Sequence, residues 1–327
     1  MKAWRVTELG EPSTAMRLVD IEEPNPGPGQ LVLRTRAAAA NFPDVLMCRG
    51  EYQIKPELPF TPGVELCGEV TGVGADVTGF AIGDRVLGGV VPPSGGFAEF
   101  AIMDANDAFP APTALDDAEA AAFYIGYQTG WFGLHRRAHL QPGETLLVHA
   151  AAGGVGSAAV QLGKAAGARV IAVVRGSAKA EVAHALGADI VVDRSVQDFV
   201  QVVKEVTSGR GADVIYDPVG GEVYQRSTKC IAFEGRILVV GFAGGQIQSA
   251  ALNHALVKNY SILGLHWGLY RWADPAAVRE CHSELTQMAR EGVVKPLISE
   301  RLPLEDAATA LQRLADGETV GRVTIIS

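Results

Sequence analysis

The chain has 327 residues, a formal net charge of −9, 48% hydrophobic residues and 20% charged residues. Its length is about twice that of an ordinary domain, which predicts two domains, and its composition excludes a disordered chain. The acidic balance argues against an extended basic surface and therefore against a nucleic-acid partner.

Three further features concern the cellular compartment. No run of about 18 apolar residues occurs, so we expect neither a membrane span nor a membrane partner. The segment MKAWRVTELG lacks the apolar core of a signal peptide and is predicted to form a strand. The four cysteines are scattered and form no CxxC pair: Cys48, Cys67, Cys230 and Cys281. We therefore expect a reduced, cytoplasmic protein.

Residues 1 to about 125 have the pattern of a compact β module. Short β-branched runs at Gln30–Arg34, Gly68–Gly74 and Asp84–Leu87 alternate with turns rich in Gly and Pro, such as Pro26–Gly29. Runs of this kind, separated by turn residues, are typical of paired strands.

From about Glu144 onward, apolar strands alternate with helices. Strands are expected at Thr145–Ala150, Arg169–Val174, Ile190–Val192, Asp213–Tyr216, Arg236–Val240 and Ser261–Leu265. Helices are expected at Val155–Ala166, Ala178–Leu186, Val196–Thr207 and Glu222–Cys230. Strands without polar alternation, each followed by a helix, form a parallel sheet covered on both faces. We therefore predict an α/β fold with a Rossmann doubly wound parallel sheet of six strands.

The C-terminal segment carries predicted helices at Pro275–Glu291 and near Leu304–Asp316, followed by a strand at Gly321–Ile326. No later segment can pair with this strand, so we expect it to return to the N-terminal β module. The Rossmann domain is then inserted into a split domain. We place the β domain at residues 1–124 and 267–327 and the Rossmann domain at residues 125–266.

A glycine-rich turn follows the first strand of the predicted Rossmann domain. Its sequence, AAAGGVG from Ala150 to Gly156, matches GxGxxG with Ala151 in place of the first glycine. A tight turn without a ligand is the alternative for such a motif alone, but the flanking strand–helix repeats favour a dinucleotide on the helix N-terminus. The predicted cofactor-binding residues of this turn are Ala152, Gly153, Gly154, Val155 and Gly156.

The end of the second Rossmann strand predicts which dinucleotide binds. An NAD site places Asp or Glu about 20 residues after the glycine turn, to hold the ribose 2′-hydroxyl. Here Arg175, Ser177 and Lys179 offer cations and a hydroxyl instead, and no acid occurs before Glu181. These groups suit a 2′-phosphate, so we predict NADPH as the cofactor. In the alternative, they are solvated residues of a helix-entry turn with Ser177 as the N-cap.

Several motifs follow one another along the whole chain: Asn41–Asp44, Pro62–Glu65 with Gly68–Val70, Gly83–Val86, Gly95–Glu99, the glycine turn with Gln161–Lys164, and Asp217–Gly221. In this order they resemble the zinc-independent, zeta-crystallin-like quinone oxidoreductase branch of the medium-chain dehydrogenase/reductase superfamily. The resemblance implies a GroES-like β domain interrupted by a Rossmann domain, which agrees with the predicted insertion.

The chain departs from the zinc enzymes of that superfamily. They carry Cys where Asn41 stands and His where Val64 stands, and Asn and Val are poor zinc ligands. The four-cysteine lobe of those enzymes would follow Gly88, where this chain has no cysteine. We therefore expect no bound metal, and we expect Cys48 and Cys67 to pack in apolar surroundings.

The resemblance also implies roles for single residues. Asn41 is expected beside the nicotinamide and Tyr52 in the substrate pocket, while Asp44 is either a pocket residue or an Asx-type cap. Five residues are expected to contact the cofactor elsewhere: Thr129, Gly241, Phe242, Leu265 and Trp267. The family commonly has a Tyr near the 2′-phosphate where this chain has Asp193, which argues against a phosphate pocket, whereas the adjacent Arg194 argues for one.

Without zinc, no Lewis acid polarises a carbonyl, so the acceptor has to delocalise charge itself. We expect NADPH-dependent hydride transfer to a small, apolar, electron-poor quinone or enone, with Asn41 and Tyr52 as donors to the developing enolate. The alternatives are an acryloyl- or enoyl-thioester reductase and an NADPH-binding protein without turnover. We also predict a homodimer, because the apolar strand Ser261–Leu265 is expected at a sheet edge that needs cover.

Overall fold

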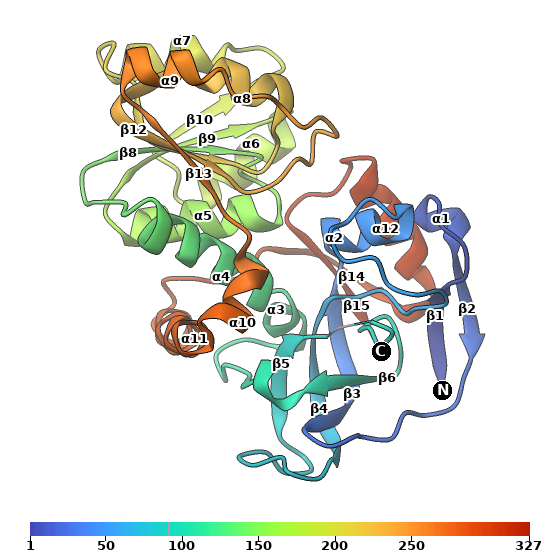
Figure 1. Cartoon of the computed structure of the whole chain (residues 1–327). Coiled ribbons are helices and arrows are strands. Elements are labelled where there is room, and N and C mark those ends of the chain that lie inside the picture. The colour runs from blue at the N-terminus through green and yellow to red at the C-terminus, as the bar shows by residue number, and fades with distance from the viewer. Residues whose placement is uncertain (91) are drawn as a thin grey trace. The chain divides into compact units, whose positions relative to one another are not determined.

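The computed structural model describes residues 1–90 and 92–327 (Figure 1). The chain divides into two compact units, one formed by Met1–Ile125 with Lys295–Ser327 and the other by Gly126–Val294. The second unit extends beyond the predicted boundary at residue 266. The reason is that α11 (Pro275–Arg290) packs against α10 (Tyr270–Ala273), and both helices belong to this unit.

The first unit is built on a mixed sheet with the strand order β14-β15-β3-β4-β5-β7, in which β6 also pairs with β3. Strands β1 and β2 form a separate antiparallel pair. The strand bounds are β1 Lys2–Val6, β2 Met16–Asp20, β3 Gln30–Ala39, β4 Glu65–Val73, β5 Arg85–Gly89, β6 Phe100–Asp104, β7 Ala108–Pro110, β14 Ile298–Pro303 and β15 Arg322–Ile326. The helices are α1 Pro12–Ala15, α2 Phe42–Arg49, α3 Asp117–Ala121 and α12 Ala307–Ala315.

The C-terminal strand β15 joins the N-terminal part of the chain. Thr324 pairs with Ala39 of β3 in antiparallel register, and the other edge of β15 pairs in parallel with β14. The predicted return of the C-terminal strand to the β module is therefore confirmed. Side chains from both ends of the chain, including Val6, Phe60 and Ile325, pack in one apolar core.

The second unit, in which every residue is described, contains a parallel sheet of six strands in the order β10-β9-β8-β11-β12-β13. The bounds are β8 Thr145–His149, β9 Arg169–Val174, β10 Ile190–Asp193, β11 Ala212–Asp217, β12 Ile231–Val239 and β13 Ser261–Gly264. The predicted Rossmann sheet is confirmed, and β13 lies at its edge. Most strand ends lie within one residue of the prediction, but β12 begins at Ile231 rather than Arg236, because an irregularity opposite β11 adds residues to its start.

Helices cover both faces of this sheet, and Figure 1 shows α5 on one face and α8 and α9 on the other. The helix bounds are α4 Tyr124–Trp131, α5 Gly154–Ala165, α6 Ser177–Ala185, α7 Phe199–Val206, α8 Gly221–Ser227 and α9 Leu252–Lys258, with a π-helical turn at Phe132–Arg137. In the part of the chain that the structure describes, every helix is too short or too polar to span a bilayer.

Candidate active site

The glycine turn lies between the carboxyl end of β8 and the N-terminus of α5. Gly153 is the N-cap of α5, and Ala150 enters the turn with a left-handed φ of 49°. A Cβ added to Gly156 would lie 2.2 Å from the Ala150 carbonyl oxygen, so only glycine lets the first turn of α5 approach the strand exit this closely. The first N–H groups of a helix have no partner within the helix, so the backbone of Ala152, Gly154 and Val155 can hold an anion.

A cluster of cations follows β9, the strand next to β8 in the sheet. Burial lowers the pKa of the Lys179 ammonium, and the nearby positive charges of Arg175 and Arg194 lower it further. The structure therefore brings together the three cations that the sequence associates with a 2′-phosphate. Ser177 is the first residue of α6 and Gly176 is its N-cap, so Ser177 does not hold the N-cap position that the alternative gave it.

Hydrogen bonds to Asp193 stabilise the loop that carries these cations. Asp193 Oδ1 accepts hydrogen bonds from Gly176 N at 2.8 Å, Ser195 N at 2.9 Å and Ser195 Oγ at 2.6 Å. These bonds lower the pKa of the Asp193 carboxyl, so it is ionised at neutral pH. Asp193 thus fixes Gly176 at a φ of 92°, a conformation that favours glycine.

A buried polar cluster lies in the first unit around the carboxylate of Glu65, which is fully inaccessible to solvent. Glu65 Oε1 accepts from Asn41 Nδ2 at 3.0 Å and from Arg322 Nη2, and Oε2 accepts from Ile125 N at 2.8 Å. Glu65 therefore connects strand β4 to the start of α2, to strand β15 and to the start of α4.

Asn41 is the N-cap of α2 and is 4% exposed. Its Nδ2 donates to Glu65 Oε1 and to the Ala39 carbonyl oxygen, both at 3.0 Å. Both amide hydrogens are thus engaged, and only Oδ1 remains for a ligand. In this arrangement Asn41 can act toward a ligand as an acceptor, rather than as the donor to an enolate that the sequence predicts.

Asp44 is completely buried, and its carboxylate caps backbone N–H groups of the α2 N-terminus and of a neighbouring loop. Oδ2 accepts from Asn41 N at 3.0 Å, and Oδ1 accepts from Gly63 N at 2.8 Å and Val64 N at 3.1 Å. Burial raises the pKa of the Asp44 carboxyl to about 7. Of the two predicted roles, the geometry favours the cap, because the carboxyl is committed to backbone N–H groups and has no access to solvent.

Tyr52 lies in a segment without regular structure after α2, as expected. Its ring is half-buried and packs against the core of the first unit. In the second unit, Thr129 and Leu265 are buried, and Gly241 and Phe242 follow the carboxyl end of β12 half-exposed. Trp267 is buried as well, and its Nε1 donates to Gln128 Oε1 at 3.2 Å.

Four buried polar residues near the candidate sites could not be singled out from the sequence: Glu65, Arg322, Gln128 and His149. Glu65 appeared only as part of a motif, and Gln128 is a fully buried amide within an apolar helix, which is the one signal that could have drawn attention to it. His149 ends β8, and its Nε2 lies 2.8 Å from Ser227 Oγ. Burial lowers the pKa of the His149 ring to about 3, so it is neutral.

The residues at the expected zinc positions do not fit a metal. Asn41 is bonded as described above, and Val64 has no coordinating atom. Among residues 1–90 and 92–327, no three His, Cys, Asp or Glu side chains are grouped closely enough to hold an ion. All four cysteines are buried and free, and burial raises the pKa of the Cys48, Cys67 and Cys230 thiols to about 12.

Comparisons with known proteins agree with this architecture. Residues 27–113 match the alcohol dehydrogenase GroES-like domain, and residues 154–283 match the zinc-binding dehydrogenase family. A quinone oxidoreductase-like protein 2 homolog from Nematostella vectensis is 40% identical over 99% of this chain and 88% of its own length. A quinone oxidoreductase structure from Pseudomonas syringae has a TM-score of 0.92 at 33% identity, covering 100% of this chain and 99% of that one. The quinone oxidoreductase of Escherichia coli in complex with NADPH has a TM-score of 0.93 at 28% identity, with both chains fully covered.

Proposed function

Because this chain belongs to the quinone oxidoreductase branch of the medium-chain dehydrogenase/reductase superfamily, we propose that it transfers hydride from NADPH to a quinone or conjugated enone without a metal ion. It is an oxidoreductase by family. The proposal rests on two features at the carboxyl ends of neighbouring strands. The glycine turn follows β8, and the cations Arg175, Lys179 and Arg194 gather where the strands beside it end.

The residues fit NADPH. A Cβ at Gly156 would fill the space between the first turn of α5 and the Ala150 carbonyl oxygen. The absence of a side chain there supports close approach of a pyrophosphate to the N-terminus of α5. Arg175 and Lys179 supply charge for a 2′-phosphate, and Ser177 supplies a hydroxyl. When bound, NADPH supplies the hydride. We assign Thr129, Gly241, Phe242, Leu265 and Trp267 to the walls around the ribose and nicotinamide.

The remaining roles belong to the first unit. Asn41 Oδ1 accepts a hydrogen bond from the nicotinamide amide or from a substrate hydroxyl, and Glu65 holds its amide group in that orientation. The Tyr52 hydroxyl donates to the oxygen that gains charge as hydride adds to the acceptor. A conjugated acceptor spreads this charge over several atoms, so one donor suffices where a simple ketone needs a Lewis acid.

We further propose that the protein is a cytoplasmic homodimer. Strand β13 pairs only with β12 within the fully described second unit, so its other edge is open. Pairing of two β13 strands across a two-fold axis satisfies these backbone groups in a closed interface. A dimer mass by light scattering at micromolar concentration supports this arrangement, and a monomer mass contradicts it.

The test of the function is oxidation of NADPH, followed by its absorbance, with a quinone, an enone and an enoyl thioester as separate acceptors. Turnover of the quinone or enone supports the proposal. Turnover of the thioester alone identifies an enoyl-thioester reductase, and binding without turnover identifies a non-catalytic NADPH protein. Loss of activity on chelation, with one zinc per chain found by elemental analysis, would overturn the metal-free mechanism.

A further inference from the structure

A hollow of about 380 Å³ lies at the end of the second unit's sheet where the strands begin. Gly211 and Ile231, at the starts of β11 and β12, form part of its wall. The glycine turn follows the carboxyl end of β8, and the strands of this sheet are parallel. The hollow therefore lies at the opposite ends of the strands from the proposed dinucleotide site. Its volume falls in the range of small-molecule sites, about 300–1,000 Å³.

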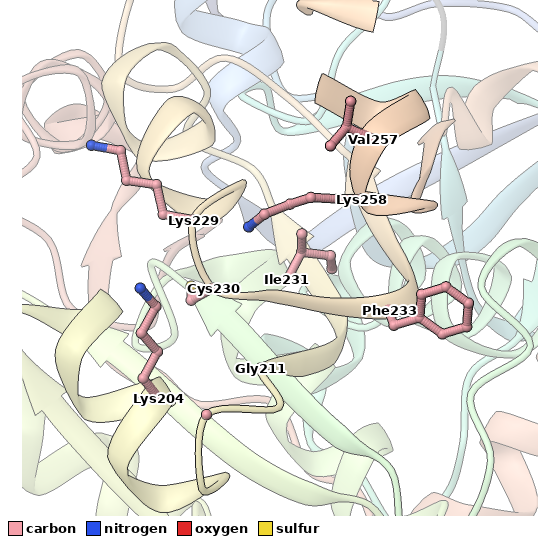
Figure 2. A pocket seen from close by; sticks show the side chains of 9 residues that line it. Lys204, Gly211, Lys229, Cys230, Ile231, Phe233, Val257 and Lys258 are labelled. Carbon is pink, nitrogen blue, oxygen red and sulfur yellow. The ribbon is translucent and has the colours of Figure 1, made fainter. Parts of the chain in front are cut away.

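Three lysines from three different segments line the hollow: Lys204 of α7, Lys229 after α8, and Lys258 at the end of α9. Figure 2 shows Lys204 and Lys258 extending from two sides toward Cys230, whereas the Lys229 side chain extends away from it. No carboxylate is among the lining residues. The charge of the hollow is therefore positive, although the whole chain has a net charge of −9.

The lysines of the hollow differ from other cations of the same unit. Lys164, Arg210 and Arg226 each form an ion pair with an aspartate. In the described part of the chain, no ion pair is recorded for Lys204, Lys229 or Lys258. Several like charges grouped without a counter-charge repel one another, and a bound anion relieves that repulsion.

Lys258 is the most constrained of the three. It is half-buried, and its Nζ donates to the Thr228 carbonyl oxygen at 2.8 Å, which fixes the ammonium at the hollow. Burial and the nearby charge of Lys204 both lower its pKa. The site thus contains an anchored ammonium whose charge nothing in the hollow neutralises.

Two apolar side chains complete the lining. Phe233 and Val257 are 69% and 75% exposed. A ligand with anionic groups at the lysines can therefore also place an apolar or ring portion against Phe233. Since Gly211 has a φ of 94° and a Cβ there would lie 2.6 Å from the Cys230 carbonyl oxygen, this wall admits no side chain.

From these observations we infer that the hollow binds a compact polyanion that carries two or more negative charges on phosphate or carboxylate groups. The inference does not depend on the proposed hydride transfer. Each lysine also lies at or after the carboxyl end of a helix, where a cation stabilises the helix dipole. That role explains each lysine separately, but it does not require three lysines from three segments to line one hollow.

The experiment titrates inorganic pyrophosphate, and separately citrate, into the full chain by calorimetry, with NADPH present at saturation to occupy the dinucleotide site. The test variant is Lys204→Ala/Lys229→Ala, since both side chains are exposed and can be removed without loss of packing. The matched control is Lys2→Ala/Lys55→Ala, which removes the same charge from exposed positions in the first unit.

We expect at least one probe to bind the wild-type chain, with an affinity at least tenfold lower in the test variant and unchanged in the control. Binding of pyrophosphate alone assigns a phosphate compound, and binding of citrate alone assigns a polycarboxylate. The inference is overturned if neither probe binds, or if both variants weaken binding equally through net charge. It is also overturned if the test variant loses thermal stability while binding is unchanged, which would leave only the helix-dipole role.

Discussion

Glu65 and Arg322 form a buried ion pair although 257 residues separate them in the sequence. The same Glu65 oxygen accepts the hydrogen bond that orients Asn41, so this pair joins the C-terminal strand to the candidate site. Arg322 neutralises a carboxylate that has no contact with solvent, and without it the Asn41 amide would lie beside an isolated buried charge.

Glu65→Gln is expected to destabilise the protein by about 3–5 kcal/mol, because it leaves the Arg322 guanidinium buried without a counter-charge. Urea unfolding measures this cost. Glu300→Gln is the matched control, since the Glu300–Arg313 pair is about one-third exposed and its loss costs at most about 1 kcal/mol. Equal costs for the two variants would show that burial of the Glu65 pair has no energetic consequence.

The Asp44 carboxyl is expected to lower the stability of the protein as pH rises from about 4 to about 7, whereas the buried neutral His149 ring contributes in the opposite direction over this range. Burial raises the pKa of Asp44 to about 7 in the folded state, against 3.8 for an ordinary aspartate. The folded state therefore holds a proton that the unfolded state releases, and ionisation at higher pH costs about 2–4 kcal/mol. In unfolding experiments at pH 4, 5.5 and 7, Asp44→Asn should lack the Asp44 contribution, so its free energy of unfolding should change with pH more positively than that of the wild type. The exposed variant Asp20→Asn should keep the wild-type slope; an unchanged slope in Asp44→Asn would contradict the assignment.

Arg175→Ala is expected to weaken NADPH binding by about 1–3 kcal/mol, the scale of a charge-assisted hydrogen bond, and to leave NADH binding nearly unchanged. Fluorescence titration with both dinucleotides measures the difference. Arg169→Ala, at the opposite end of β9, serves as the control. If NADPH and NADH weaken equally, Arg175 supports the loop and does not bind the phosphate.

Gly156→Ala is expected to lower NADPH affinity at least tenfold and to lower the melting temperature as well. Its Cβ would lie 2.2 Å from the Ala150 carbonyl oxygen, so α5 or the turn must move. Gly264→Ala is the control, because no heavy atom lies within 4 Å of a Cβ at that position. Wild-type affinity in Gly156→Ala would mean that the turn tolerates this shift and does not set the cofactor position.

Tyr52→Phe is expected to lower kcat about tenfold, equivalent to about 1.4 kcal/mol of transition-state stabilisation, with NADPH affinity unchanged. A hydrogen bond to the growing negative charge strengthens during the reaction, so its loss appears in kcat. Steady-state kinetics with an enone and a quinone test this side by side. Unchanged turnover of both acceptors would leave Tyr52 as a packing residue of the pocket.

The Rossmann part of the fold could be predicted because its information is local. Each strand is a short apolar run, and a turn and a helix follow most of them, so the six parallel strands and the edge position of β13 could be predicted from neighbouring residues alone. The glycine turn was located in the same way. The start of β12 was missed because the residues before Arg236 owe their strand conformation to an irregular pairing with β11.

The details of the first unit could not be derived in this way. Asn41 was singled out from the sequence, but its hydrogen-bond partners, Ala39 and Glu65, are set by the packing of β3 against β4. Its free acceptor could therefore be seen only in three dimensions. The position of Arg322 beside Glu65 depends on the pairing of β15 with β3, which joins the two ends of the chain.

The pairing of β15 with β3 also has a consequence for synthesis on the ribosome. The nucleotide unit is contiguous in sequence and can fold as soon as residue 294 has emerged, since domains fold as units during translation. The first unit has to wait, with the β15-facing edge of β3 unpaired and Glu65 without Arg322, until β15 has left the exit tunnel. Throughout that delay the nascent chain exposes an unpaired apolar strand edge, which is a site of possible aggregation until β15 pairs with it.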